Sequence, residues 1–366
     1  MSDVVIVGGG VVGLASAYEL SRAGAEITLL EYGKTGMQAT NAAAGMLAPL
    51  IEAHDGSPML RIGLRALRAY PALVDELERI AGFGLEFRPH GILKVAFDEA
   101  GLAELHRRVS WQRDFGLPID ALDAASCREL EPRLSRRVAG GVFSSSEGSV
   151  SSQLLALALE RAAAAAGAVI HNGAPVTGFE RAGDRVVAVR SRDRSFPCDA
   201  VVLAAGARSG QIARLLRIHL PVRPVRGQMI ALGGMLAPVQ HIVWGPDGYL
   251  VPRANGLIFA GATVEEVGFR RRTTVAGVRA MRRMARTLVP QLASATVHFA
   301  WAGLRPGSPD GLPIIGPLPA YPNVIAATGH YRNGILLGPL TGALVARGIC
   351  EGDWSAVPPE FRPGRF

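Results

Sequence analysis

Residues 4–13 read VVIVGGGVVG, and this stretch decides the fold. A β-branched run leads into the glycines, and apolar residues follow at helical spacing from Leu14 to Leu20, which predicts a strand, a tight turn and a helix. Gly24 is placed to end that helix, and the apolar run 27–30 predicts a second strand. The N-terminal segment therefore has the pattern of a β-α-β unit.

Gly8, Gly10 and Gly13 have the G-x-G-x-x-G form. In a strand-to-helix turn, the first glycine allows a sharp bend, the second lets the backbone approach a pyrophosphate, and the third lets the helix pack closely on the sheet. Glu31 lies 18 residues beyond Gly13, at the end of the second strand, where it can accept a hydrogen bond from a ribose hydroxyl. The alternative is a glycine-rich turn followed by a surface glutamate. An acid at this position argues against a 2′-phosphate, so the motif favours FAD or NAD over NADP.

Periodicity and turn residues predict further helices and strands along the chain. The expected helices cover residues 59–80 (broken near Pro71), 102–115, 152–166, 273–288 and 335–349. The expected strands cover residues 168–171, 176–180, 185–190, 200–204 and 323–327; the second and third form a hairpin, and strand-like runs from 222 to 262 indicate an antiparallel sheet. The β-α-β start, the strand before Gly206 and the last strand and helix fit one nucleotide-binding layer. The antiparallel part must pack elsewhere, so we expect an α/β (α+β) fold of two interleaved domains.

Composition indicates a folded chain and argues against a nucleic-acid surface. The hydrophobic fraction is 49% and the charged fraction 19%, which can supply two cores. The formal net charge is +8, but the 39 basic residues, all Arg except Lys34 and Lys94, are scattered along the sequence. The cluster 270–272 has no interleaved aromatic residues for base stacking, so a solvated turn before a helix is favoured over a nucleic-acid patch.

The cysteines and apolar stretches indicate the compartment. Cys127, Cys198 and Cys350 lie far apart without C-x-x-C spacing, so we expect neither a metal site nor a disulfide framework. The N-terminus carries Asp3 in place of a basic region and is interrupted by glycines, unlike a secretory signal. The longest apolar stretch, 334–346, is too short and glycine-rich to span a bilayer. We therefore expect a soluble, cytoplasmic protein with no membrane partner.

The C-terminal third separates FAD from NAD. Residues 301–316, WAGLRPGSPDGLPIIG, and 329–337, GHYRNGILL, resemble the signature of the D-amino-acid oxidase family of flavoenzymes, and within it the glycine oxidase group of the thiamine pathway. Residues 39–49, ATNAAAGMLAP, are similar to the small-residue loop that the family runs against the flavin ring. The resemblance covers essentially the whole chain. It implies a Rossmann-like FAD-binding domain built from residues 1–80, 147–220 and 318–366, interleaved with an antiparallel-sheet substrate-binding domain built from residues 81–146 and 221–317.

The glycine motif and the resemblance together assign residues to non-covalently bound FAD. They are Gly8, Gly10, Val11, Val12, Gly13, Glu31, Tyr32, Ala39, Thr40, Ala44, Gly45, Met46, Val176, Gly206, His330, Tyr331, Arg332, Asn333, Gly334, Ile335 and Leu336. A glycine-containing turn before the last helix offers partial positive charge, which suits a reduced anionic flavin; the alternative is a plain helix cap.

The predicted substrate site centres on Arg305. It follows a predicted strand among apolar neighbours, where a guanidinium can hold a carboxylate through two hydrogen bonds; the alternative is a buried structural ion pair. The resemblance assigns Arg305 and Tyr249 to the substrate carboxylate and places Arg332 near the substrate, where it could instead serve the flavin or the loop. His330 is not assigned as a base, because the family's chemistry needs none. Arg208 stands where relatives often carry Trp, which puts local flavin-edge packing or oligomer contacts in question.

The resemblance implies oxidation of the C–N bond of a small amino acid, such as glycine, sarcosine or a small D-amino acid, by hydride transfer from Cα to flavin N5. The partners are then the amino acid and dioxygen, the products are an oxo acid, ammonia and hydrogen peroxide, and relatives often form homo-oligomers. One alternative is a D-amino-acid or secondary-amine dehydrogenase that passes electrons to a quinone. A covalently flavinylated sarcosine oxidase is disfavoured, because no cysteine lies between residues 305 and 340. The non-enzyme alternative, a nucleotide-binding module with an Arg-rich nucleic-acid surface, leaves Arg305 and Tyr249 without a purpose.

Overall fold

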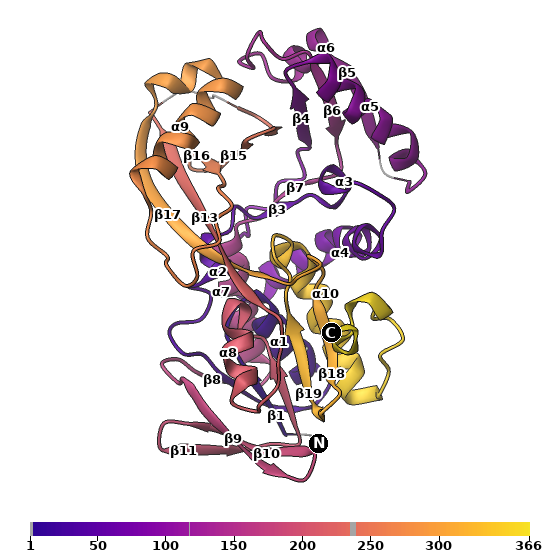
Figure 1. The fold of residues 1–366 in the computed structure, drawn as a ribbon, viewed down its shortest axis with the longest axis vertical. Helices are drawn as coiled ribbons and strands as arrows, with labels where there is room; N and C mark the ends of the chain where they lie inside the picture. Colours follow the sequence, from indigo (N-terminus) through magenta and orange to yellow (C-terminus); the bar gives the residue numbers. More distant parts are fainter. Residues whose placement is uncertain (1–2, 117, 235–238) are drawn as a thin grey trace.

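A six-stranded sheet forms the centre of one half of the molecule (Figure 1), in a computed structural model that describes residues 3–116, 118–234 and 239–366. The strand order is β18-β19-β12-β1-β2-β8. The strands are β1 (Asp3–Val7), β2 (Glu26–Leu30), β8 (Val169–His171), β12 (Ala200–Leu203), β18 (Ile314–Leu318) and β19 (Tyr321–Thr328). All neighbours pair in parallel except the edge strand β18, which is antiparallel to β19. The N-terminal β-α-β unit and the α/β fold class are confirmed.

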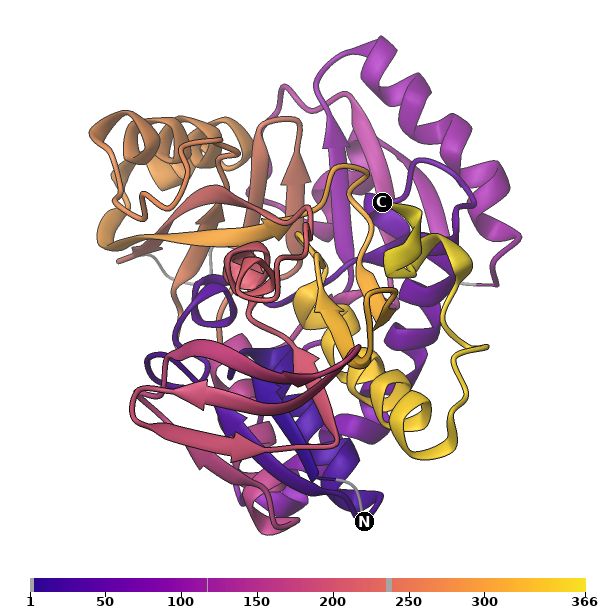
Figure 2. The same ribbon diagram turned by 60° about the horizontal axis from the view of Figure 1, so that its bottom comes forward.

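This half of the molecule has three layers, and alternate side chains of β1 point to the two outer layers. Val4 and Ile6 pack among helices on one face of the sheet, and Val5 and Val7 pack against a small second sheet on the other. The helices are α1 (Val11–Arg22), α7 (Ser152–Ala165) and α10 (Gly334–Glu351). The small sheet contains β9 (Val176–Ala182), β10 (Arg185–Ser191) and β11 (Arg194–Pro197), and Figure 2 brings it to the front. The predicted hairpin is therefore confirmed, and it carries a third strand that the sequence did not predict.

An eight-stranded sheet forms the other half, with strand order β17-β13-β16-β15-β14-β4-β6-β5. The strands are β4 (Ile92–Ala96), β5 (Ile119–Asp123), β6 (Gly140–Ser144), β13 (Arg223–Gly233), β14 (Ile242–Gly245), β15 (Gly248–Pro252), β16 (Ile258–Gly261) and β17 (Thr296–Gly307). Helix α9 (Val275–Leu288) lies beside one end of this sheet, and α5 (Glu99–Arg113) and α6 (Ala124–Leu130) lie beside the other (Figure 1).

The antiparallel sheet expected from residues 222–262 is present in the part of that stretch that the structure describes, which leaves out 235–238. The sheet also contains strands from the 81–146 segment. One pair of its described strands differs from the expected antiparallel arrangement, because β14 pairs with β4 in parallel. β4 and β14 come from two segments that are far apart in the sequence. No hairpin connects them, so no tight turn forces the two strands to be antiparallel.

Pro71 does not break the helix that contains it, contrary to the sequence prediction. Helix α4 runs without interruption over Pro58–Ala81. A proline removes one backbone hydrogen bond, but the apolar face of α4 is buried on both sides of it, at Leu67 and Val74. The Tyr70 hydroxyl, next to the proline, donates a hydrogen bond to the carbonyl of Ile335 over 2.6 Å. Tertiary packing therefore outweighs the local cost of the proline.

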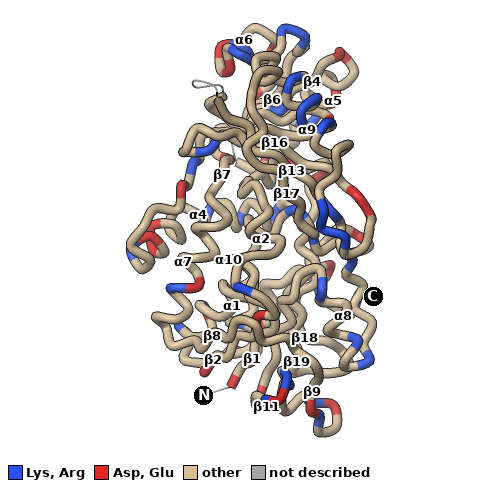
Figure 3. Tube along the Cα trace, turned by 90° about the vertical axis from the view of Figure 1, so that its left-hand side faces the viewer, with Lys and Arg blue, Asp and Glu red and all other residues tan. Residues whose placement is uncertain are grey.

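Charged residues of both signs are spread over both halves (Figure 3). Arg226 forms an ion pair with Glu265, and Nη2 of Arg253 lies 2.9 Å from Oε2 of Glu86. Residues 270–272 are exposed in the turn before α9, as the sequence predicted.

Helix α10 is 18 residues long, because it continues beyond the apolar stretch 334–346. By length and composition alone, it is long and apolar enough to cross a membrane. Within the described structure, however, it packs as a core helix against α1 and α4. Two glycines, Gly338 and Gly342, face α1. A Cβ on Gly338 would lie 3.1 Å from Val11, and one on Gly342 would lie 2.6 Å from the carbonyl carbon of Ala15. The two helices therefore approach backbone to backbone.

This contact generates a stability prediction for Gly342→Ala. A glycine-to-alanine change in an open helix position normally stabilises the helix, by about 1 kcal/mol. Here the added methyl group meets the backbone of Ala15, which cannot rotate away, so we expect a loss of about 1–3 kcal/mol in stability and a lower melting temperature. The measurement is thermal unfolding at a fixed, saturating FAD concentration. Gly364→Ala, where a Cβ meets nothing within 4 Å, is the matched control. An unchanged or raised melting temperature for Gly342→Ala would show that the helices can separate without cost.

Candidate functional site

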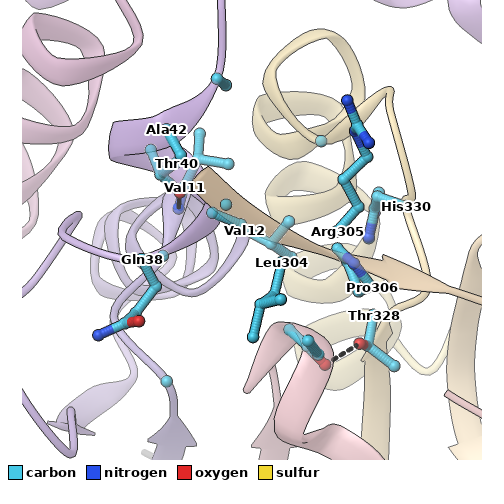
Figure 4. Close-up of a pocket in the computed structure, with 18 of the residues that line it drawn as sticks. Val11, Val12, Gln38, Thr40, Ala42, Leu304, Arg305, Pro306, Thr328 and His330 are labelled. Carbon is cyan, nitrogen blue, oxygen red and sulfur yellow. Dashed lines mark hydrogen bonds between the residues drawn. The ribbon is translucent and has the colours of Figure 1, made fainter. Parts of the chain in front are cut away.

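A cavity of about 470 Å³ lies where the carboxyl ends of β1, β2 and β12 meet the ends of β13 and β17. Its walls come from segments far apart in the sequence (Figure 4): the first turn of α1, the 38–48 loop, β17 and the turn before α10. The loop contains α2 (Ala39–Ala42) and β3 (Met46–Leu47), which pairs with β7 (Gly148–Ser149); α3 (Pro49–Glu52) follows. The η1 turn (Gly206–Arg208) and α8 (Ser209–Arg214) come after β12.

The glycine turn aims the start of α1 at this cavity. Gly8 has φ +110°, a conformation that favours glycine, and a Cβ there would lie 2.5 Å from the Ala204 carbonyl oxygen. The amide of Val11 donates to the Thr40 hydroxyl over 3.1 Å. Within the described residues, the amides of Gly10 and Val12 have no hydrogen-bond partner. The cavity therefore meets free N–H groups and the positive end of a helix, which suits an anion such as a diphosphate.

Glu31 lies at the end of β2 and is almost completely buried. Its carboxylate accepts hydrogen bonds from the amide of Gly9 over 2.7 Å and from the amide of Gly33 over 2.9 Å. These bonds tie the loop after β2 to the glycine turn. They also hold the carboxylate at the cavity wall, where both oxygens keep lone pairs for a further donor.

Most residues that the sequence assigned to the cofactor line this one cavity. They are Gly8, Gly10, Val11, Val12, Glu31, Tyr32, Ala39, Thr40, Ala44, Gly45, Met46, Val176, Gly206, His330, Tyr331, Arg332, Asn333, Gly334 and Ile335. Gly13 and Leu336 are the two that do not belong to its described lining. Gly13 packs back against the Gly8 carbonyl oxygen, and Leu336 is buried toward Gly63 of α4.

The turn before α10 presents a second helix N-terminus. His330 is buried, its Nε2 lies 2.9 Å from the Thr341 hydroxyl, and burial lowers its pKa to about 4. The imidazole is therefore neutral at ordinary pH and a weak base. Among the described residues, the amides of Gly334 and Ile335 lack hydrogen-bond partners, so they are free to donate into the cavity.

Arg305 and Tyr249 meet at the other part of the cavity. Nη1 of Arg305 donates to the carbonyl of Thr263 over 3.0 Å, and a Cβ on Gly227 of the adjacent strand β13 would lie within 2.4 Å of the guanidinium. The missing side chain at Gly227 therefore makes room for Arg305. Burial raises the pKa of Tyr249, with a smaller opposing effect from the Arg305 and Arg332 charges, so its hydroxyl stays protonated and can donate.

Glu52 is a lining residue that sequence reasoning missed. Its carboxylate pairs with Arg332, with Oε1 lying 3.2 Å from Nη2 and 3.3 Å from Nε. The Arg332 guanidinium also lies over the Trp244 ring, 5.3 Å from its centroid. Glu52 is 280 positions away from its partner in the chain and carries no local motif, so only the tertiary structure reveals the pair.

Arg208 forms a cation–π stack at the cavity wall. This is the position at which the sequence has Arg where relatives often carry Trp. Its guanidinium lies 4.9 Å from the Tyr32 ring centroid and 5.1 Å from that of Phe269. Nη1 of Arg271 donates to the Gln38 side chain over 2.6 Å, so this basic residue also reaches the lining. Among the described residues, no cluster of three or more His, Cys, Asp or Glu side chains could hold a metal ion.

Comparisons with known proteins agree with this geometry. The family profile described as FAD dependent oxidoreductase (DAO) matches residues 3–347. The glycine oxidase of Geobacillus kaustophilus is 35% identical over 346 residues, which are 94% of this chain and 92% of the relative. The bifunctional protein ThiO/ThiG of Synechocystis sp. is 36% identical over 371 residues; these span 100% of this chain but only 54% of that longer relative. A crystal structure of the Geobacillus kaustophilus glycine oxidase has a TM-score of 0.95 at 33% identity, covering 100% of this chain and 99% of that one.

These similarities confirm the resemblance carried by residues 301–316 and 329–337, the choice of FAD over NAD, and amino-acid oxidation as the class of reaction. The match to the family profile and the identity both extend over nearly the whole chain. The chain therefore belongs to the DAO family of FAD-dependent oxidoreductases.

Proposed function

We propose that this enzyme oxidises glycine, or a similarly small amino acid such as sarcosine or a small D-amino acid, with Arg305 and Tyr249 binding the substrate carboxylate. The observation that carries the proposal is the pairing of a guanidinium and a protonated phenol at one part of the cavity. Nη1 of Arg305 is bound to a neutral carbonyl, so its positive charge remains available for an anion. The relatives named glycine oxidase support the substrate class.

The residues of the cavity fit FAD at several independent points. Glu31 supplies a buried carboxylate for a ribose hydroxyl, and the first turn of α1 supplies free amides for the diphosphate. Residues 42–45 present small side chains, and a Cβ on Gly45 would lie 1.9 Å from the Val150 carbonyl oxygen, so the loop is held backbone to backbone. The free amides of Gly334 and Ile335 suit the negative charge that develops on a reduced flavin.

We propose that FAD is bound without a covalent link. None of the cysteines lines the described cavity: Cys127 and Cys198 are buried elsewhere, and Cys350 is exposed near the end of α10. All three are free thiols in the structure. Free thiols also support the proposed cytoplasmic location.

The protein contributes orientation to the reaction. Arg305 holds the substrate carboxylate through a planar fork, and Tyr249 donates a further hydrogen bond to it, which fixes the direction of the Cα–H bond. Bound FAD would supply the acceptor for the Cα hydride, and dioxygen would take up the electrons as hydrogen peroxide. The substrate amine must be neutral to assist hydride departure. The imine product is hydrolysed to an oxo acid and ammonia, or to an oxo acid and methylamine when the substrate is sarcosine. A quinone in place of dioxygen is the alternative acceptor, and oxygen consumption during turnover distinguishes the two.

We also propose a division into an FAD-binding unit (1–80, 147–220 and 318–366) and a substrate-binding unit (81–146 and 221–317). Its support is that the strands of the two sheets fall largely into these two sets of segments. Strand β18 begins at Ile314 and pairs with β19, so it crosses the last proposed boundary. Assembly of the chain into a homo-oligomer is a further proposal, which size-exclusion chromatography with light scattering tests.

The first prediction from the proposed function concerns FAD retention. Glu31→Ala removes the carboxylate that holds the amides of Gly9 and Gly33 and that we place against the ribose, so FAD affinity is expected to fall about 10- to 100-fold. Titration of apoprotein with FAD, followed by flavin fluorescence, measures this. Glu26→Ala, at the exposed start of the same strand, is the control. The same FAD affinity in both variants would mean that Glu31 is not a cofactor ligand.

The second prediction concerns Arg305→Ala. Loss of the guanidinium removes both the attraction for the carboxylate and the orientation of Cα–H, so kcat/KM for glycine is expected to fall by about three powers of ten or more. FAD content is expected to stay normal, and an amine without a carboxylate, already a poor substrate, is expected to lose little further. Arg223→Ala, on the exposed part of the neighbouring strand β13, is the matched control. A folded, FAD-replete Arg305→Ala enzyme with normal kcat/KM would refute the assignment.

A further inference from the structure

The part of the cavity around Tyr249 contains two positive charges and one negative charge. Arg305, Arg332 and Glu52 all line the cavity and all act on the Tyr249 hydroxyl. Within the described chain, Arg305 has no acidic partner; its guanidinium donates a hydrogen bond to the carbonyl of Thr263. Arg332, in contrast, is paired with Glu52 through two of its nitrogens. The net charge available to a ligand is therefore +1, and it is carried by Arg305.

A buried clamp holds Glu52 in this position. Glu52 ends α3, a turn of only four residues. The fully buried carboxyl group of Glu147 accepts hydrogen bonds from the amides of Leu50 and Ile51. The Lys94 side chain donates to the Ile51 carbonyl over 2.9 Å, and Gln112 donates to the Leu50 carbonyl over 2.7 Å. The polar backbone groups of the turn are thus held by side chains from three other segments.

Burial disfavours the ionised forms of two side chains of this clamp. Burial raises the pKa of Glu147 to about 8 and lowers the pKa of Lys94 to about 8. Both shifts show that these groups lose hydration in the folded protein. Lys94 also lies 5.7 Å from the Trp244 ring centroid, and Arg332 lies over the same ring, so the clamp and the ion pair share one wall.

We propose that Glu52 determines how many carboxylates a substrate can carry. By neutralising Arg332, it leaves one unpaired guanidinium, Arg305, for one carboxylate. A substrate with a second carboxylate would bring that charge close to the Glu52 carboxylate and find Arg332 occupied. Glu52 is therefore a positioning residue that acts through Arg332 and selects monocarboxylate amino acids. The inference rests on the proposed function, in which Arg305 binds the first carboxylate.

Glu52→Gln tests the inference with two matched substrates, sarcosine (N-methylglycine) and iminodiacetate (N-carboxymethylglycine). They differ in whether the group on nitrogen is neutral or carries a carboxylate. The substitution keeps the size of the side chain but removes its charge, so Arg332 becomes available to the second carboxylate. We expect the ratio of kcat/KM for iminodiacetate to that for sarcosine to rise about 10- to 100-fold, the scale of one charged hydrogen bond.

Two further variants separate selectivity from a structural effect. The double variant Glu52→Gln/Arg332→Gln restores the net charge of +1 and is expected to return the substrate ratio to within about threefold of the wild-type value. Glu86→Gln breaks an equivalent pair with the buried Arg253, away from the cavity lining, and is expected to leave the ratio unchanged. FAD content and melting temperature are measured for every variant to confirm that it is folded.

The outcomes distinguish this inference from the proposed function. If the wild-type enzyme oxidises neither glycine nor sarcosine nor a small D-amino acid, the proposed function fails. If it oxidises them but Glu52→Gln lowers both substrates equally, Glu52 is only a structural support and the inference fails alone. A raised ratio that persists in the double variant also overturns it, because the effect would then not pass through Arg332.

Discussion

The rest of the structure depends on a close approach of backbone to backbone at the glycine turn. A Cβ on Gly8 would lie 2.5 Å from the Ala204 carbonyl oxygen, and one on Gly13 would lie 1.9 Å from the Gly8 carbonyl oxygen. These contacts require glycine, and they press the start of α1 onto the carboxyl ends of β1 and β12. With α1 so placed, its free amides face the cavity, and Glu31 at the end of β2 can reach the amide of Gly9.

The second helix of the site is positioned by the first. Gly338 and Gly342 of α10 pack on the backbone of α1, so the two helix axes approach closely. This packing brings the N-terminus of α10 to the same cavity as the N-terminus of α1. Two helix termini with free amides then serve one ligand, which suits a cofactor that carries negative charge at its diphosphate and, when reduced, at its ring.

The opposite wall follows a different physical rule, because it is built from ionisable side chains that need ionic or hydrogen-bond partners. Glu52 pairs with Arg332, Glu147 and Lys94 bind the backbone of the turn that carries Glu52, and Arg305 keeps its charge for a ligand. Burying an ionised group is unfavourable unless it is paired or hydrogen-bonded, so each of these positions constrains its neighbours. Under the proposed function, the charge of the substrate is matched to the one guanidinium that the protein leaves unpaired.

The sequence by itself determined the β-α-β start, the α/β fold class, FAD as the cofactor and the family, because these depend on local signals. A G-x-G-x-x-G turn between a strand and a helix, an acid at the end of the second strand and the 301–316 stretch can each be recognised without knowing what lies opposite. Only the tertiary structure decided that α4 continues through Pro71, that β14 joins β4 in parallel, and that Glu52 pairs with Arg332. Those features depend on packing and on charge pairs between segments far apart in the chain. The residues that make such contacts show no periodicity or fixed spacing in the sequence, so sequence patterns do not predict these contacts.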